Sequence, residues 1–185
     1  MATSNKVSKK SFYEVQAPFT SAKIVLYAGS LEELHGKVVR IDLTRNLRGK
    51  SLELKLRVKH ENGQLIAEPF ALELAGSYIR RMIRKGTDYV EDYFQAVCKD
   101  ASVIVKPFLI TRNKVSRALR RTLREQARAH LEAYLKARTA KEAFTDITTN
   151  KSQKELSLKL KKIYPLALCE IRTFTLVEAK KKLLA

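Results

Sequence analysis

The chain has 185 residues, 45% of them hydrophobic, and its 37 lysine and arginine residues outnumber 19 aspartate and glutamate residues. This composition excludes a wholly disordered chain and is sufficient for one sizeable domain or two small ones. The formal net charge of +18 exceeds what solubility requires, and its self-repulsion indicates an anionic partner. Nucleic acid is the first candidate for that partner, an anionic membrane is the second, and chance surface basicity is the third.

Two cysteines, Cys98 and Cys169, and three scattered histidines do not have the spacing of metal ligands. The cysteines are therefore predicted to be buried thiols in a reducing compartment. The first residues lack the apolar run of a signal peptide, and no stretch approaches the roughly 20 apolar residues that cross a bilayer. We expect a soluble, intracellular protein without metal or cofactor.

The first third of the chain predicts a tail and a β-sheet. Residues 1–12 are polar and lysine-bearing, which indicates a basic disordered tail. The β-branched stretch HGKVVRIDL predicts a strand over residues 35–43. Leucine and valine then alternate with charged residues over 52–58, which is the period of a half-buried strand.

A hairpin is predicted to follow this strand. The dipeptide Asn62-Gly63 tolerates the positive φ angles of a tight turn. The returning strand would cover residues 65–70, with Pro69 near its end or on an edge.

The next segment predicts a helix and a second hairpin. In GSYIRRMIRKG the apolar residues recur four apart, so a helix is expected with Ser77 as its cap and Gly86 at its end. Residues 93–110 predict two strands around a turn at 99–102, and the apolar run after the turn suggests burial on both faces.

A long basic helix is predicted from Asn113, its plausible cap, through residue 138. Four arginines fall within a sector of about 60° when successive residues are placed 100° apart, and Arg120 lies beside them. These four are Arg117, Arg121, Arg124 and Arg128. The predicted apolar back of the helix consists of Val115, Leu119 and Leu123, while Leu131 and Leu135 fall on the arginine side and need another cover.

The last segment predicts a loop, a short helix and a strand. Residues 145–156 are predicted as a loop with a capping signature, Ser152 followed by Glu155, that starts a helix ending near Lys162. Residues 167–179 alternate as a strand. Lys180, Lys181 and Lys182 then form a basic end.

No motif in the chain indicates catalysis. The six glycines are spread out rather than gathered in a phosphate loop. The carboxylates Asp88, Glu91 and Asp92 are more simply explained as solvated charges that offset Arg84 and Lys85. We therefore predict no enzyme and no small-molecule substrate.

The arginines favour a nucleic acid over a membrane. A guanidinium hydrogen-bonds phosphate with two parallel N–H groups and stays charged at cellular pH. A membrane-binding helix would need a broad apolar face, but the chain has no tryptophan and the predicted helix offers three aliphatic residues that a core requires. The alternative interpretation is that the arginines form an ordinary solvated helix surface that binds nothing. Basic elements at both ends of the chain, on a helix and in loops, suggest contact with a large folded RNA from several sides.

Five motifs, in order, resemble the small-subunit ribosomal protein family known as S-three-a, or S-one-e, of archaea and eukaryotes. They are KKSFYEVQAP, ELHGKVVRIDL, IRRMIRKGTDYVEDYF with KDASVIVKPFLIT, the arginine helix, and IYPLALCEIR. The resemblance covers residues 9–176. It implies a structural role on the platform of the small subunit, near the 3′ end of its RNA and the messenger exit, beside other platform proteins. It also implies a cytoplasmic ribosomal location, with assembly in the nucleolus if the source is eukaryotic.

The sequence thus predicts an α+β fold, with a mainly antiparallel sheet or partial barrel, packed helices and one long basic helix. The expected organisation is a tail at 1–12, one ribosomal-RNA-binding domain at 13–177 and a basic tail at 178–185. A transient assembly or regulatory factor that binds nucleic acid remains the alternative. The predicted RNA-binding residues are Lys9, Lys10, Arg112, Lys114, Arg117, Arg120, Arg121, Arg124, Arg128, Lys161, Lys162, Arg172, Lys180, Lys181 and Lys182.

Overall fold

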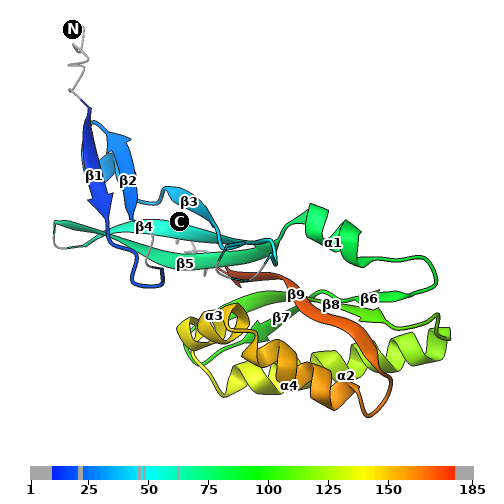
Figure 1. Ribbon diagram of the computed structural model, residues 1–185. Helices are drawn as coiled ribbons and strands as arrows, with labels where there is room; N and C mark the ends of the chain where they lie inside the picture. The colour runs from blue at the N-terminus through cyan, green and yellow to red at the C-terminus, as the bar shows by residue number, and fades with distance from the viewer. Residues whose placement is uncertain (1–9, 21–22, 46, 48, 62, 178–185) are drawn as a thin grey trace, which may run out of the picture. The chain divides into compact units, whose positions relative to one another are not determined.

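The computed structural model describes residues 10–20, 23–45, 47, 49–61 and 63–177, and Figure 1 shows their helices and strands. The fold is α+β, as predicted. Every pair of strands whose register is defined among the described residues is antiparallel. One sheet is the pair β1-β2, and the other follows the order β3-β4-β5-β9-β8-β6, with β7 also pairing with β8. The larger sheet is not closed into a barrel among the described strands.

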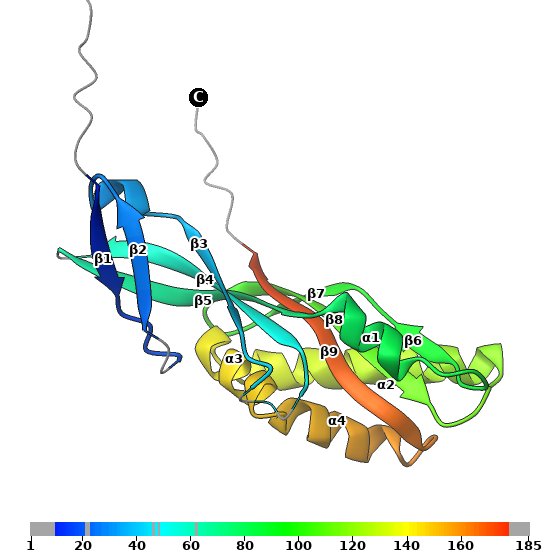
Figure 2. The same ribbon diagram turned by 45° about the horizontal axis from the view of Figure 1, so that its top comes forward.

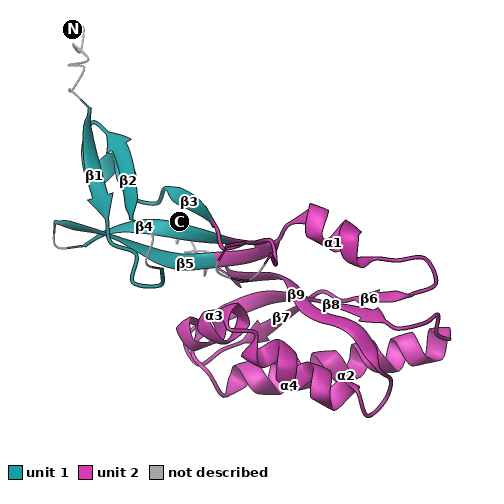
Figure 3. Ribbon diagram, viewed as in Figure 1, with its two compact units in different colours: residues 1–41, 54–70 teal, residues 42–53, 71–185 magenta. Residues whose placement is uncertain are grey.

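The chain divides into two compact units, residues 1–41 with 54–70 and residues 42–53 with 71–185 (Figure 3). Strands β4 and β5 contribute residues to both units. A single domain over 13–177 remains a prediction. Strand β1 begins at Ser11, so the predicted boundary at residue 12 lies inside a strand. The rest of the two predicted tails, apart from Lys10, lies outside the described residues.

The first unit is built mainly from β-hairpins. Its elements are β1 (Ser11–Val15), β2 (Ile24–Ala28), the short 3-10 helix η1 (Glu32–Leu34), β3 (Val38–Asp42) and the unit's parts of β4 (Leu52–Glu61) and β5 (Gln64–Leu74). The alternation predicted for β4 is confirmed, since Leu54, Leu56 and Val58 are fully buried. In the β4-β5 turn Gly63 has a φ of 78°, which favours glycine, while Asn62 lies outside the described residues. Strands β1 and β2 were not predicted.

Pro69 lies inside β5 and is buried, so it is not near the end of the strand. The other predicted position, on an edge, fits the pairing of β5 better. Strand β5 pairs with β9 only from Ala71 to Glu73, so the proline precedes that ladder. Proline lacks an N–H, but it is tolerated at this position because no described strand pairs with β5 on the β9 side at Pro69.

The second unit contains the sheet formed by β6 (Tyr89–Glu91), β7 (Phe94–Val97), β8 (Ser102–Thr111) and β9 (Leu166–Val177). Strand β8 is central, because β9 pairs with it on one side and β6 and β7 pair with it on the other. The predicted hairpin around 99–102 is confirmed, with the Cys98 N–H donating to the Ala101 carbonyl at 2.8 Å. Val103 and Val105 are fully buried on one face, but Ile104 between them is only partly buried. The burial on both faces that we predicted for this run is found further along β8, over 108–110.

The described helices of this unit are α1 (Gly76–Met82), α2 (Arg117–Lys136), α3 (Ala140–Thr148) and α4 (Lys151–Leu160). Figures 1 and 2 show α2, α3 and α4 on one face of β6 to β9, and α4 contacts β9 while α2 contacts β6 and β7. In α1 the cap is Ala75 and Ser77 lies inside the helix, contrary to the prediction. Gly86 follows in a turn with a φ of 90°.

The loop predicted over 145–156 is wrong, because α3 and α4 occupy most of it. Ser152 does not cap α4 but is buried inside it, where its hydroxyl donates to the side-chain oxygen of Gln153 at 2.8 Å. The residue before α4 is Asn150, whose φ of 61° is left-handed, so the chain turns sharply between the two helices. This turn brings α3 and α4 together as a pair.

Helix α3 begins with a complete capping box. The Thr139 hydroxyl accepts from the Glu142 N–H at 3.3 Å, and the Glu142 carboxylate accepts from the Thr139 N–H at 3.0 Å. Replacing Thr139 with alanine should lower the free energy of unfolding by about 1 kcal/mol. Urea unfolding followed by circular dichroism measures this. The control Thr145→Ala removes an exposed hydroxyl that only bonds back to the Lys141 carbonyl, and should cost less.

Candidate nucleic-acid interface

Helix α2 starts at Arg117, not at the predicted cap Asn113. Ser116 is the cap, and its hydroxyl accepts from the Leu119 N–H at 3.3 Å. The segment before the helix is held by Asp88, whose carboxylate accepts from the Val115 N–H at 2.9 Å. Asp88 is thus a structural acceptor rather than the freely solvated charge that we predicted.

The apolar side of α2 also differs from the prediction. Val115 and Leu119 are only half-buried. The buried stripe runs further along the helix and consists of Leu123, Ala127, Leu131, Tyr134 and Leu135. Helices α3 and α4 cover its second half, since Leu131 and Leu135 surround a small cavity together with Ala143 and Ile147 of α3. The unpredicted helix α3 therefore supplies the cover that the two leucines require.

The arginine face of α2 lies beside the buried stripe, about a quarter-turn around the helix. It is defined as Arg117, Arg121, Arg124 and Arg128, all four of which are exposed, as the helical spacing predicts. Two of them pair along the helix: Arg121 donates to Glu125 at 2.8 Å, and Arg128 donates to Glu132 at 2.9 Å. Each of these hydrogen bonds raises the pKa of its guanidinium, so both remain fully charged. Such exposed pairs are weak and leave the remaining N–H groups free for a phosphate.

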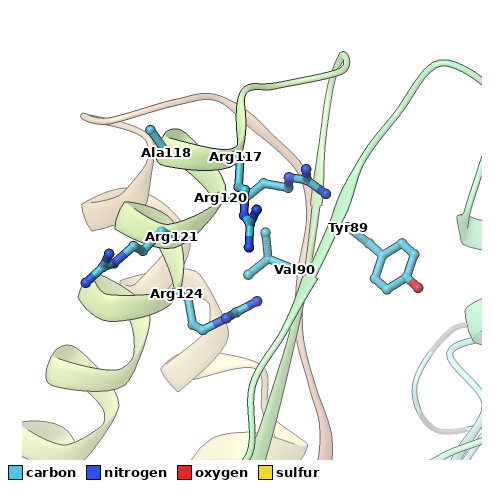
Figure 4. A pocket seen from close by; sticks show the side chains of 7 residues that line it. All are labelled: Tyr89, Val90, Arg117, Ala118, Arg120, Arg121 and Arg124. Carbon is cyan, nitrogen blue, oxygen red and sulfur yellow. The ribbon is translucent and has the colours of Figure 1, made fainter.

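An open groove of about 600 Å³ lies between the first half of α2 and strand β6. Figure 4 shows the side chains of Arg117, Arg120 and Arg124 extending toward β6 at Val90. Arg121 also lines the groove, but its guanidinium is directed away from Val90. Neither Arg117 nor Arg124 forms an ion pair with any carboxylate in the described part of the chain. The Nε of Arg120 is buried and lacks a hydrogen-bond partner among the described residues. The groove thus gathers three positive side chains that an anion would neutralise.

A second groove, of about 520 Å³, continues from Arg124 and has mixed charge. It is lined by Arg124 and Arg172 together with Glu91 and Asp92. The Arg172 guanidinium donates to the Glu91 carboxylate at 2.7 Å, so this predicted RNA-binding residue already has an internal partner. Lys106, which lies over the Tyr93 ring at 5.3 Å, also lines the groove and was missed, because a single lysine in an apolar strand gives no sequence signal.

The other predicted site residues do not line these grooves. Arg112 and Lys114 are exposed in the segment before α2, and Lys161 and Lys162 are exposed after α4. Lys10 belongs to the first unit, where its Nζ lies 5.9 Å from the centre of the Tyr27 ring. Lys9, Lys180, Lys181 and Lys182 lie outside the described residues.

The described residues contain no group of three or more histidine, cysteine, aspartate or glutamate side chains placed to hold a metal ion. Cys98 is buried, which raises the pKa of its thiol to about 11 and keeps it protonated. Among the described helices, none has the length and apolar character needed to span a membrane.

The fold and this surface define a class of protein: an α+β chain that packs one face of a helix on an antiparallel sheet and presents arginines beside that face. Comparison with known families identifies the class more closely. The chain belongs to the Ribosomal S3Ae family, whose model matches residues 1–180. This agrees with the family that the five sequence motifs resemble.

Curated relatives of the chain are archaeal proteins named small ribosomal subunit protein eS1. The protein of Methanothermobacter thermautotrophicus is 28% identical over 70% of this chain and 68% of its own length. That of Sulfurisphaera tokodaii is 26% identical over 96% of both chains. That of Haloarcula marismortui is 25% identical over 95% of this chain and 86% of its own. The similarity therefore extends over nearly the whole chain.

Proposed function

We propose that the chain is a structural component of the small ribosomal subunit and that it holds ribosomal RNA through the arginine face and the groove beside it. The observation that carries this proposal is the groove, where Arg117, Arg120 and Arg124 converge without a described acidic partner. A fold that tolerates such repulsion is suited to a partner that supplies phosphates at this place. The net charge of +18 and membership in a ribosomal protein family support the same partner.

Each part of the surface has a role in this proposal. The groove arginines bind phosphates of the RNA backbone, and Arg112 and Lys114 extend the contact along the segment that enters α2. Lys161 and Lys162, exposed at the end of α4, provide a separate contact. The basic ends of the chain, with Lys9, Lys10 and Lys180 to Lys182, complete the set of RNA-binding residues that we propose.

The place of the chain in the subunit is part of the proposal. We propose that it lies on the platform, near the 3′ end of the RNA and the messenger exit, and that it supports subunit assembly and translation there beside other platform proteins; the family resemblance supports this location. The alternative is a factor that binds RNA transiently and leaves. The two differ in how permanently the arginine face is covered by RNA.

Sedimentation of a native lysate through sucrose gradients tests the proposal. The chain should sediment with the small subunit at low salt and remain with it after a high-salt wash. A chain buried in RNA dissociates slowly, because many phosphate contacts must break together before it leaves. Release to the top of the gradient by the wash would favour the transient factor. Absence from the subunit fractions even at low salt would contradict both ribosomal roles.

A further inference from the structure

An exposed pair of aromatic rings stands on the β1-β2 hairpin, which belongs to the first unit, whereas the arginine face belongs to the second. Phe12 and Tyr27 are directly opposite one another in the register of the two strands, and their ring centres are 4.9 Å apart. The Phe12 residue is 75% exposed and the Tyr27 residue 55% exposed. Neither ring contributes to the core, and an exposed aromatic pair of this kind needs a different explanation.

The hairpin holds these rings in a fixed orientation. On its inner face Val15 and Ala28 are buried, so the alternation of the strands turns Phe12 and Tyr27 outward. The end of β1 is tied to β5, since the Gln16 N–H donates to the Leu65 carbonyl at 2.9 Å and the Ala67 N–H donates to the Gln16 carbonyl at 2.8 Å. A ligand that stacks on the rings would therefore meet a surface that is already ordered.

The charges around the rings favour one kind of ligand. The Nζ of Lys10 lies 5.9 Å from the centre of the Tyr27 ring, so a cation stands beside the π faces. Glu14 lies on the same outward face, opposite Val25 and two pairs further along the hairpin. A nucleotide can stack its base on the rings and place its phosphate by Lys10, away from Glu14. A protein partner would need a larger apolar area than two rings and one valine provide.

We infer that Phe12 and Tyr27 form a stacking platform for one or two unpaired bases of RNA, with Lys10 as the contact to the adjoining phosphate. This inference rests on the proposed function only in taking RNA as the partner, and it does not depend on the arginine face. It predicts that the chain binds single-stranded RNA by a contact that paired RNA cannot make, because bases inside a duplex have no free face.

The test is fluorescence anisotropy with the full chain, a labelled single-stranded RNA of about ten nucleotides and the same RNA paired with its complement. Phe12→Leu keeps an apolar side chain but removes the ring, and should weaken single-strand binding about tenfold while leaving duplex binding unchanged. Phe12→Tyr keeps the ring and should bind both RNAs as the unsubstituted chain does. Tyr27→Leu should repeat the result of Phe12→Leu.

Two controls make the outcome decisive. Because both rings are exposed, circular dichroism melting of Phe12→Leu should match that of the unsubstituted chain. Single-strand binding by Phe12→Leu that equals that of the unsubstituted chain would overturn the platform and leave the rings as a surface for a protein. A variant with Arg117, Arg121 and Arg124 changed to alanine separates the two proposals. If this variant binds neither RNA while Phe12→Leu binds normally, the result supports the arginine face and contradicts the stacking platform. If this variant binds normally while Phe12→Leu loses single-strand binding, the result supports the platform alone.

Discussion

Replacing Lys50 with methionine should lower the free energy of unfolding by about 3–5 kcal/mol, the largest effect that we expect from a single substitution. The ammonium of Lys50 is almost fully buried and lies 2.5 Å from the Glu170 carboxylate on β9, with side chains 8% and 12% exposed. It also donates to the Asn150 side-chain oxygen at 2.6 Å. Methionine fills the same space without a charge, so the carboxylate would remain buried and unpaired.

The double variant Lys50→Met with Glu170→Leu tests this cause. Removing both charges should restore most of the lost stability, because the cost arises from the uncompensated carboxylate and not from the missing attraction. The single variant should also recover part of its stability as the pH falls, since an unpaired buried carboxylate takes up a proton more readily when folded than when unfolded. Guanidinium unfolding of the three chains at two pH values measures both effects. Equal loss in the single and double variants would contradict this account.

This ion pair illustrates which contacts sequence patterns reveal. Lys50 and Glu170 are 120 residues apart, and neither lies in a pattern that indicates burial. The strands β4 and β9 were predictable from their alternation, and β8 from its apolar run after a turn, because both signals are local properties of the chain. Partners that meet only after the sheet has formed leave no such local signal.

The missed helix α3 has a different cause. Its sequence, AKEAFTDIT, ends in threonine and isoleucine, and β-branched residues weaken a helical pattern. Packing of Phe144 edge-on against Phe174 of β9, with ring centres 4.9 Å apart, stabilises the helix from outside. The available signal was Thr139 followed by Glu142, a capping box three residues apart, which we did not use.

The candidate site was predictable in part. Helical spacing placed the arginine face correctly on the exposed side of α2, because one helix keeps its period regardless of its surroundings. The groove was not predictable, since it depends on where β6 lies beside the helix. That neighbour brings Arg120 into the groove, although the helical projection put Arg120 beside the arginine face and not within it.

Changing Arg117, Arg121 and Arg124 together to alanine should weaken RNA binding by roughly one to two orders of magnitude at moderate salt. Each phosphate contact that is lost also removes a counterion-release term, so the slope of log affinity against log salt should fall by about two to three. The fold should remain intact, because these three side chains are exposed and the helix keeps its buried stripe. Anisotropy titrations at several salt concentrations, with a melting curve for each chain, measure both quantities.

The matched control changes Lys136, Lys154 and Lys159 to alanine. These exposed residues lie outside both grooves, and their loss lowers the net charge by the same three units. If RNA binding depends on local contacts with the arginine face, the control should keep most of the affinity for RNA. If it depends only on the net charge, the two variants should have equal affinity. Equal weakening would therefore assign RNA binding to the net charge of the chain. A melted arginine variant whose RNA binding is unchanged would instead mean that these arginines maintain the fold and do not hold the RNA.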